Sequence, residues 1–257
     1  MLRQLARRYR LAALYGTVIF ACEALLRSGA VQPALIGYSL LLLLCLHRSA
    51  FAAPQERPLS LAVALIPVMR VAGLTMPIRA LDPGYRYALV AVPALVAAGI
   101  AVRRAGYSRR DVGLVVTAPG LVLSGVAIPL CVVLGLLAHQ ATGEIPIVTR
   151  PAFDEVALPA LALALSTSIP EELVFRGMLQ RVSVGQLGRL GGIAYAVSIF
   201  VAVSAGSWTP ALLAIVTLCG FLFSQMTLMS RSILPAATGH ALFNVTFLVA
   251  APFVMQR

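Results

Sequence analysis

Long apolar segments recur along most of the chain, from about residue 11 to Met255. A helix that crosses a bilayer needs about 20 apolar residues, and division of the chain by this length gives about nine spans, within a range of about eight to ten. The candidate spans lie near 11–27, 31–46, 59–78, 87–102, 113–138, 156–182, 191–207, 209–230 and 233–255. Glycine and proline mark the junctions, among them Gly191 and Gly192. The pattern predicts an all-α fold, a polytopic bundle of transmembrane helices.

The composition agrees with a chain that has lipid as its main solvent. Hydrophobic residues make up 60% of the sequence and charged residues 11%, whereas soluble domains average about 45–50% and about 25%. The net charge is +11, and all 20 basic residues are arginine. These arginines stand in ones and twos at the ends of apolar segments, without a basic stripe that alternates with aromatic residues. The chemistry therefore excludes nucleic acid as the expected partner and indicates the lipid bilayer.

The arginines also predict the orientation, because basic residues are concentrated in cytoplasmic loops. The N-terminal group consists of Arg3, Arg7, Arg8 and Arg10, so we expect the N-terminus in the cytoplasm. Further arginines fall on junctions that this topology also places there: Arg48, Arg57, Arg103, Arg104, Arg109, Arg110, Arg181, Arg189 and Arg231. The junction that fits least well is 79–86, where Arg79 and Arg86 would lie outside. A lysine-free chain rich in alanine and arginine is typical of a bacterium with GC-rich DNA, which makes the plasma membrane the expected location.

Polar residues are distributed differently in two parts of the chain. We expect an N-terminal part, 1–150, with about five spans and a C-terminal part, 151–257, with about four. Only the C-terminal part has clusters of polar residues inside its spans, and ionisable groups at that depth are functional candidates. In the N-terminal part, Glu23 lies four residues before Arg27, which favours a helical ion pair near the membrane surface. Arg70 is expected to extend to the interface or to pair with a carboxylate of another span.

The segment Ser168–Gly177, SIPEELVFRG, carries the first polar cluster. Pro170 suits a first helical position, which Ser168 or Thr167 would cap, so that Glu171 and Glu172 lie in a first turn. Glu172 and Arg176 are spaced for a pair on one helix face, and Glu171 points about 100° away. One carboxylate would be held by charge and the other free to react. The alternative is a capping cluster, because the helix dipole alone favours acids in a first turn.

The last span carries the second polar cluster in Gly239–Asn244, GHALFN. His240 and Asn244 lie one helical turn apart on the same face. Lipid would penalise such a polar stripe, so we expect it to face the interior of the bundle. The four cysteines lie inside apolar segments without C-x-x-C spacing, which indicates neither disulfides nor a zinc knuckle.

Together, EELVFRG and GHALFN resemble the CPBP family, the intramembrane CAAX-protease and bacteriocin-processing (Abi) proteins, over roughly residues 151–255. The family pattern is E-E-x-x-x-R, then F-x-x-x-H, then H-x-x-x-N. The first motif matches at Glu171, Glu172 and Arg176, and the third at His240 and Asn244. In the second, Phe200 matches, but Ser204 stands in the place of the histidine.

The resemblance implies peptide-bond hydrolysis by a glutamate-activated water, on a membrane-associated protein or peptide. Glu171 would be the base, Glu172 and Arg176 would fix it and balance its charge, and His240 with Asn244 would hold the carbonyl oxygen. Ser204 can hydrogen-bond a water but cannot take up its proton near neutral pH. Two functions therefore stay open: an intramembrane endopeptidase in which Ser204 positions the water, and a catalytically impaired pseudoprotease that acts as a membrane regulator or scaffold.

The cofactor is open as well. A metal-dependent version of the family's reaction has been proposed, with a divalent ion such as zinc, but catalytic zinc sites usually keep three protein ligands. Without the middle histidine, this chain offers one histidine and carboxylates, and the glutamate mechanism needs no metal. A transporter is a weaker alternative, because the chain shows no internal repeat of the kind common in transporters.

Overall fold

The computed structural model describes residues 2–76, 83–143, 147, 150, 152–205 and 209–255, and these residues form helices without any strand. The α-helices are α1 (Leu2–Arg27), α2 (Val31–Phe51), α3 (Arg57–Thr75), α4 (Pro83–Arg104), α5 (Ala118–Thr142), α6 (Phe153–Leu163), α7 (Ile169–Glu172), α8 (Arg181–Ser204), α9 (Pro210–Ser230), α10 (Leu234–Val245) and α11 (Ala251–Val254). Three π-helical stretches join some of them: η2 (Ala164–Ser168), η3 (Leu173–Gln180) and η4 (Thr246–Ala250). The all-helical prediction is confirmed.

Within the described ranges, 7 helices are long and apolar enough to cross a membrane. They are Ala6–Arg27, Val31–Phe51, Arg57–Thr75, Ala118–Thr142, Glu155–Ser204, Pro210–Ser230 and Leu234–Val254. The two spans expected near 156–182 and 191–207 both fall in the run Glu155–Ser204, and α4 is not among the 7. The chain is thus a multi-pass membrane protein, while the exact count of about nine spans is not confirmed and the orientation remains a prediction.

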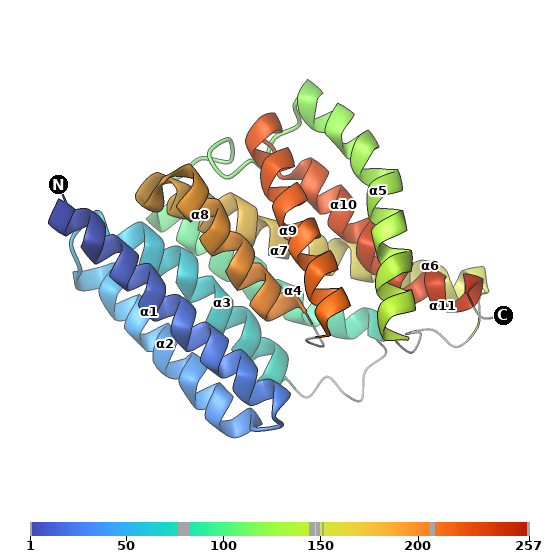
Figure 1. Cartoon of the computed structure of the whole chain (residues 1–257), viewed down its shortest axis with the longest axis horizontal. Helices are drawn as coiled ribbons and strands as arrows, with labels where there is room; N and C mark the ends of the chain where they lie inside the picture. The colour runs from blue at the N-terminus through green and yellow to red at the C-terminus, as the bar shows by residue number, and fades with distance from the viewer. Residues whose placement is uncertain are drawn as a thin grey trace.

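The C-terminal half bends at Gly188 and not at Gly191 and Gly192, where the junction was expected. Gly188 has φ 78° and ψ 169°, a conformation inside α8 that is open almost only to glycine. The helix then continues through Gly191 and Gly192 to Ser204. The Tyr9 hydroxyl donates to the carbonyl of Leu187 at 2.7 Å, which ties the bend to α1, and α8 runs on beside α1 (Figure 1).

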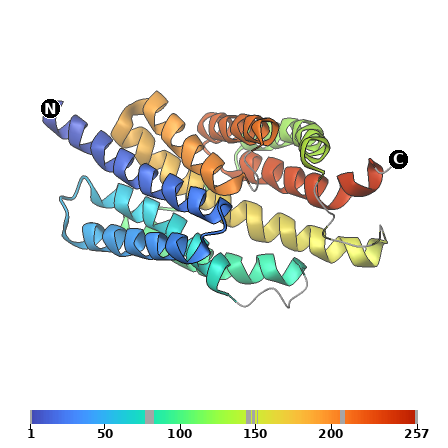
Figure 2. The same ribbon diagram turned by 60° about the horizontal axis from the view of Figure 1, so that its bottom comes forward.

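The helical run from α6 through η3 lies between two groups of helices (Figure 2). On one side are α1 to α4, where Tyr15 and Tyr38 are fully buried. On the other side are α5, α9 and α10, which pack against one another. Both polar clusters of the sequence therefore lie inside the bundle, where lipid does not reach them.

Several junctions that carry arginine meet at one end of the bundle. Arg7 Nε lies 2.8 Å from Glu56 Oε1, and Arg48 pairs with the same carboxylate. Gln186 Nε2 donates to the carbonyl of Gln55 at 2.7 Å. Arg181 Nη2 pairs with Asp111 at 3.0 Å. These contacts join the N-terminus, the α2–α3 turn, the α4–α5 connection and the region of the Gly188 bend, as the predicted topology requires of loops on one side.

Candidate active site

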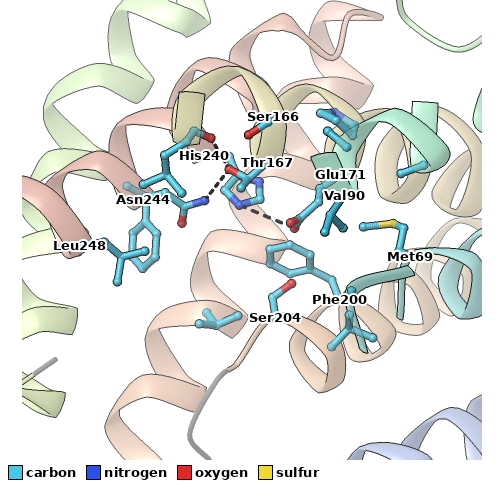
Figure 3. A pocket seen from close by; sticks show the side chains of 18 of the residues that line it. Met69, Val90, Ser166, Thr167, Glu171, Phe200, Ser204, His240, Asn244 and Leu248 are labelled. Atoms are coloured by element: carbon cyan, nitrogen blue, oxygen red, sulfur yellow. Dashed lines mark hydrogen bonds and ion pairs between the residues drawn. The ribbon is translucent and has the colours of Figure 1, made fainter. Parts of the chain in front are cut away.

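A cavity of about 570 Å³ lies where α3, α4, α8, α9 and α10 meet the run from Leu163 to Glu171. Glu171, Ser204, His240 and Asn244 line it. Figure 3 shows these side chains from three separate segments directed toward one space. Glu172 and Arg176, which complete the set of site residues expected from the sequence, are buried directly beside it. The fold thus brings both polar motifs and Ser204 to one place.

The glutamates lie inside a continuous helical run and not at a helix start. Helical structure extends from Phe153 through η2, α7 and η3, and neither Ser168 nor Thr167 caps Pro170. Their hydroxyls instead donate to carbonyl oxygens four residues earlier, as Ser and Thr side chains do within helices. The prediction that Ser168 or Thr167 caps a helix start was therefore wrong. The alternative of a capping cluster was wrong as well, because Glu171 and Glu172 lie within a continuous helical run and not at a free helix N-terminus.

The π-helical turn before the glutamates, η2, has a sequence cause. Pro170 has no N–H to donate to the preceding turn, which disturbs the α-helical hydrogen-bond pattern there. The three hydroxyl side chains before it, Ser166, Thr167 and Ser168, donate to carbonyls one turn further back, at residues 162–164. π-helical turns are rare in proteins, and many of those that occur lie at functional sites. In this chain they surround the two glutamates.

Glu172 is the charged centre behind the cavity wall. Its Oε1 accepts a hydrogen bond from Arg176 Nη1 at 2.9 Å, so the pair expected from the i,i+4 spacing is present. The same oxygen lies 2.8 Å from His240 Nδ1. Glu172 is fully buried and Arg176 is 3% exposed. From the sequence, Glu172 and Arg176 were expected to fix Glu171. In the structure, Glu172 contacts His240 and holds that imidazole instead.

Aromatic rings hold the cation and the imidazole in place. The Arg176 guanidinium lies 4.1 Å from the centre of the Phe200 ring, and its Nη2 donates to the carbonyl of Gly220 at 3.4 Å. His240 stacks on Phe223 with ring centres 5.8 Å apart and planes at 21°. The sequence interpretation assigned no role to Phe223, because one aromatic residue in an apolar span carries no signal of its own.

Glu171 is the carboxylate that reaches the cavity. Its side chain is 24% exposed, and its Oε2 lies 3.8 Å from His240 Nε2. This distance is too long for a direct hydrogen bond and leaves room for a water or a carbonyl oxygen to contact both groups. The two nitrogens of His240 therefore face two different glutamates, one buried and one accessible.

Asn244 is oriented by Thr167. Thr167 Oγ1 donates its single proton to the carbonyl of Leu163 at 2.7 Å, so it must act as the acceptor toward Asn244, whose Nδ2 lies 3.0 Å away. This assignment fixes the side-chain amide with its nitrogen on the side of Thr167. The second N–H of Asn244 stays available to the cavity.

Ser204 completes the lining at the C-terminal end of α8. Its hydroxyl oxygen is buried and has no hydrogen-bond partner among the described residues. In Figure 3 it lies beneath Phe200, which lines the same cavity. A buried hydroxyl without a partner is costly unless a bound group satisfies it.

The described residues do not fit a metal site. No group of three or more His, Cys, Asp or Glu side chains among them is arranged to hold an ion. The cavity has one imidazole, and the Nδ1 of that ring is engaged by Glu172.

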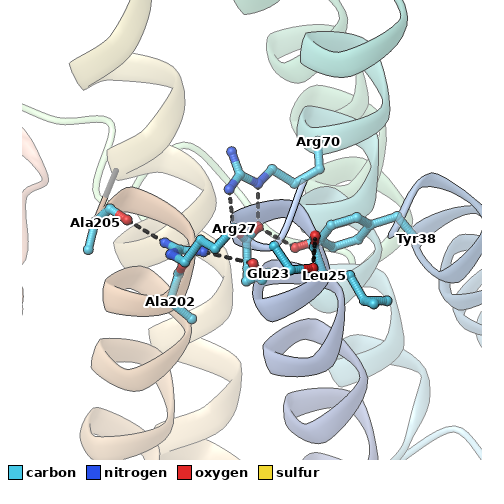
Figure 4. Close-up of polar contacts among 8 residues, drawn as sticks. Glu23, Leu25, Arg27, Tyr38, Arg70, Ala202 and Ala205 are labelled. Atoms are coloured by element: carbon cyan, nitrogen blue, oxygen red, sulfur yellow. Dashed lines mark hydrogen bonds and ion pairs between the residues drawn. The ribbon is translucent and has the colours of Figure 1, made fainter. Parts of the chain in front are cut away.

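Glu23 and Arg70 form a second buried polar cluster (Figure 4). Glu23 pairs with Arg27 at 2.9 Å, as its spacing predicted, but it is fully buried and does not lie at a surface. Arg70 does not extend to the interface, because its Nε and Nη2 donate to the two oxygens of Glu23. The Tyr38 hydroxyl donates to the same carboxylate. Of the two alternatives for Arg70, pairing across helices is the one observed.

One comparison with known proteins gives a match, and it lies in the second half of the chain. Residues 153–246 match the family model described as type II CAAX prenyl endopeptidase Rce1-like, and this range includes Glu171, Ser204 and Asn244. No curated protein and no solved structure matches the chain. Residues 153–246 are thus similar to the Rce1-like type II CAAX prenyl endopeptidases, in agreement with the CPBP resemblance of the motifs in this range.

Proposed function

We propose that this protein is an intramembrane endopeptidase in which Glu171 activates the water that hydrolyses a peptide bond of a membrane-associated protein or peptide. One observation carries the proposal. Glu171 and His240 Nε2 meet at 3.8 Å on the wall of a cavity of about 570 Å³, while Glu172 and Arg176 hold the other side of the imidazole. An accessible base beside a fixed hydrogen-bond donor is the arrangement that hydrolysis of an amide needs.

The charges of the site balance when His240 carries protons on both nitrogens. Two carboxylates then face one guanidinium and one imidazolium, and the four groups sum to zero. Such compensation matters because an unpaired charge in a buried site costs several kcal/mol, on the order of 3–5 for a broken pair. In this state, Nδ1–H donates to Glu172 and Nε2–H is directed to the cavity.

The first step begins with a water between Glu171 and the carbonyl carbon of the substrate. Glu171 takes one proton, the water oxygen forms a bond to the carbon, and the carbonyl π electrons move to the oxygen. Nε2–H of His240 and the free N–H of Asn244 donate to that oxyanion. Donors aimed at developing charge in a dry site contribute about 10²–10³ in rate each.

In the second step, the C–N bond breaks and Glu171 returns its proton to the leaving amine. The products are a carboxylic acid and an amine, so all atoms are accounted for. The Ser204 hydroxyl forms a hydrogen bond with the attacking water, as donor or as acceptor, and so gains the partner that it otherwise lacks. Since a serine cannot take a proton from water near neutral pH, Glu171 alone acts as the base.

A cleavage assay on the purified protein in detergent tests the proposal. The substrates are a set of membrane peptides that includes a prenylated peptide with a C-terminal CAAX sequence. We expect Glu171→Gln to lower kcat by about 100-fold or more, because it removes the general base while it keeps the shape. Ser204→His is expected to raise kcat, because an imidazole provides a second group that can take the proton.

The matched control is Glu155→Gln, the same chemical change on the same helical run, at a residue that does not line the cavity. It should cleave at the wild-type rate. Unchanged cleavage by Glu171→Gln would refute the role of Glu171. No cleavage by the wild type together with activity in Ser204→His would instead identify the natural protein as a pseudoprotease.

A further inference from the structure

Arg70 is a cavity residue that the proposed reaction does not use. It lines the cavity from α3, together with its neighbours Met69 and Gly73. Among the described lining residues it is the only arginine. Its side chain is 27% exposed. A guanidinium on the wall of an otherwise mostly apolar cavity is expensive, so it is a functional candidate in its own right.

The guanidinium of Arg70 is held in one orientation from behind. Its Nε and Nη2 donate to Glu23 Oε1 and Oε2, an arrangement with two parallel hydrogen bonds. Glu23 is fully buried and is itself oriented by the Tyr38 hydroxyl. Nη1 has no partner among the described residues, and Figure 4 shows it on the side away from Glu23. One donor group of a rigidly held cation is therefore left over.

The cluster around Glu23 carries an excess of positive charge. The single carboxylate pairs with both Arg70 and Arg27, so the three groups sum to one positive charge. Arg27 also donates Nη2 to the carbonyls of Ala202 and Ala205, at the C-terminal end of α8. A helix C-terminus is the negative end of its dipole, which offsets part of the charge of Arg27. The excess positive charge of the cluster is thus left at Arg70, on a cavity wall that also carries the carboxylate of Glu171.

We propose that Arg70 binds a carboxylate of the ligand that enters the cavity and so determines which peptides are accepted. That the ligand is a peptide rests on the proposed function. A guanidinium with a free edge prefers carboxylates, and charge-assisted hydrogen bonds are roughly twice as strong as neutral ones. Two sources share this chemistry, the C-terminal carboxylate of a peptide and the side chain of an acidic residue.

Binding of labelled peptides tests the inference without the need for cleavage. The probes are dansylated peptides of alternating alanine and leucine, compared in two pairs. The first pair is the peptide with a free C-terminus and its C-terminal amide. The second pair consists of two C-terminal amides, one with Asp and one with Asn next to the last residue. Binding is measured by dansyl fluorescence in the Glu171→Gln background, which consumes no peptide. We expect the carboxylate form of at least one pair to bind about tenfold more tightly than its neutral partner, which corresponds to about 1.4 kcal/mol. The pair that shows the difference identifies the source of the carboxylate.

Arg70→Gln should abolish this preference, and Arg70→Lys should keep part of it. Glu23 stays paired with Arg27 in both variants, so the fold has no unpaired buried acid. Arg27→Gln is the matched control, because it removes the other guanidinium from the same carboxylate at a residue that does not line the cavity. It should retain most of the preference, because Arg70 keeps its place on the cavity wall and its two hydrogen bonds to Glu23.

Two results would overturn the inference: equal binding of both members of each pair by the parent protein, or an undiminished preference in Arg70→Gln. The inference and the proposed function fail separately. A wild-type protein that cleaves none of the peptides but prefers carboxylates through Arg70 would refute the peptidase and leave the carboxylate site intact.

Discussion

At the scale of residues, Glu172 and Arg176 form a buried ion pair. Replacement of both partners of such a pair destabilises a protein less than replacement of one. Removal of one partner leaves an uncompensated charge and costs about 3–5 kcal/mol. We therefore expect Arg176→Met to lower the free energy of unfolding by about that amount, and the double variant Glu172→Gln/Arg176→Met to lose less than the sum of the single variants. Unfolding in mixed detergent micelles, followed by circular dichroism, measures this difference.

The control for this cycle is Arg189→Met, the same substitution at an exposed arginine of α8. It should leave the free energy of unfolding unchanged within about 0.5 kcal/mol. Strict additivity of the two single losses would show that Glu172 and Arg176 do not stabilise each other.

The residue scale also shows where prediction from the sequence ends. The i,i+4 spacing was enough to predict the Glu172–Arg176 contact, because that spacing is a local property of any helix. It could not reveal that His240, 68 positions away, lies against the same oxygen atom. That contact depends on how α10 packs against α7, and a sequence pattern contains no information on such a distance. For the same reason, the choice between two outcomes for Arg70 required the structure.

At the scale of elements, α5 lies in close contact at Gly135 with the end of α10 and the start of η4. A Cβ atom there would lie 2.9 Å from the backbone carbonyl oxygen of Phe243 and 2.8 Å from Thr246 Cβ. Because the backbone cannot yield as a flexible side chain does, Gly135→Ala should destabilise the protein by about 1–3 kcal/mol. Cleavage should fall as well, since Asn244 follows Phe243 directly. Thermal unfolding in detergent and the peptide assay measure the two effects.

Gly125 offers the matched control on the same helix, because a Cβ atom there would meet nothing within 4 Å. Gly125→Ala should be neutral or stabilise by up to about 1 kcal/mol, since alanine favours a helix. Equal stability of the two variants would contradict a tight contact between α5 and α10.

Element types were more predictable than element ends. Apolar length predicted the helices, because a bilayer-spanning segment must satisfy its own backbone hydrogen bonds. The bend at Gly188 was not predicted, because among the glycines of this stretch the adjacent pair Gly191 and Gly192 is the stronger breaker signal. The position of the bend depends on packing: the Tyr9 hydroxyl binds the carbonyl of Leu187, and the bend follows at the next residue, Gly188.

At the scale of the whole molecule, the arginine-bearing junctions share one end of the bundle, and the positive-inside rule predicts that this end faces the cytoplasm. Cysteine labelling tests the prediction, because the native Cys22, Cys45, Cys131 and Cys219 are all buried. The test positions are the exposed residues Ser28 and Ala53, at opposite ends of α2, and Ala141, near the end of α5.

In sealed right-side-out vesicles, a membrane-impermeant maleimide should label Ser28→Cys and Ala141→Cys. It should label Ala53→Cys only after detergent opens the vesicles, because Ala53 lies in the turn beside Glu56, to which Arg7 and Arg48 are bound. The unsubstituted protein gives the background of the buried thiols. The reverse pattern would invert the orientation, and labelling of Ser28→Cys and Ala53→Cys from the same side would show that α2 does not cross the membrane.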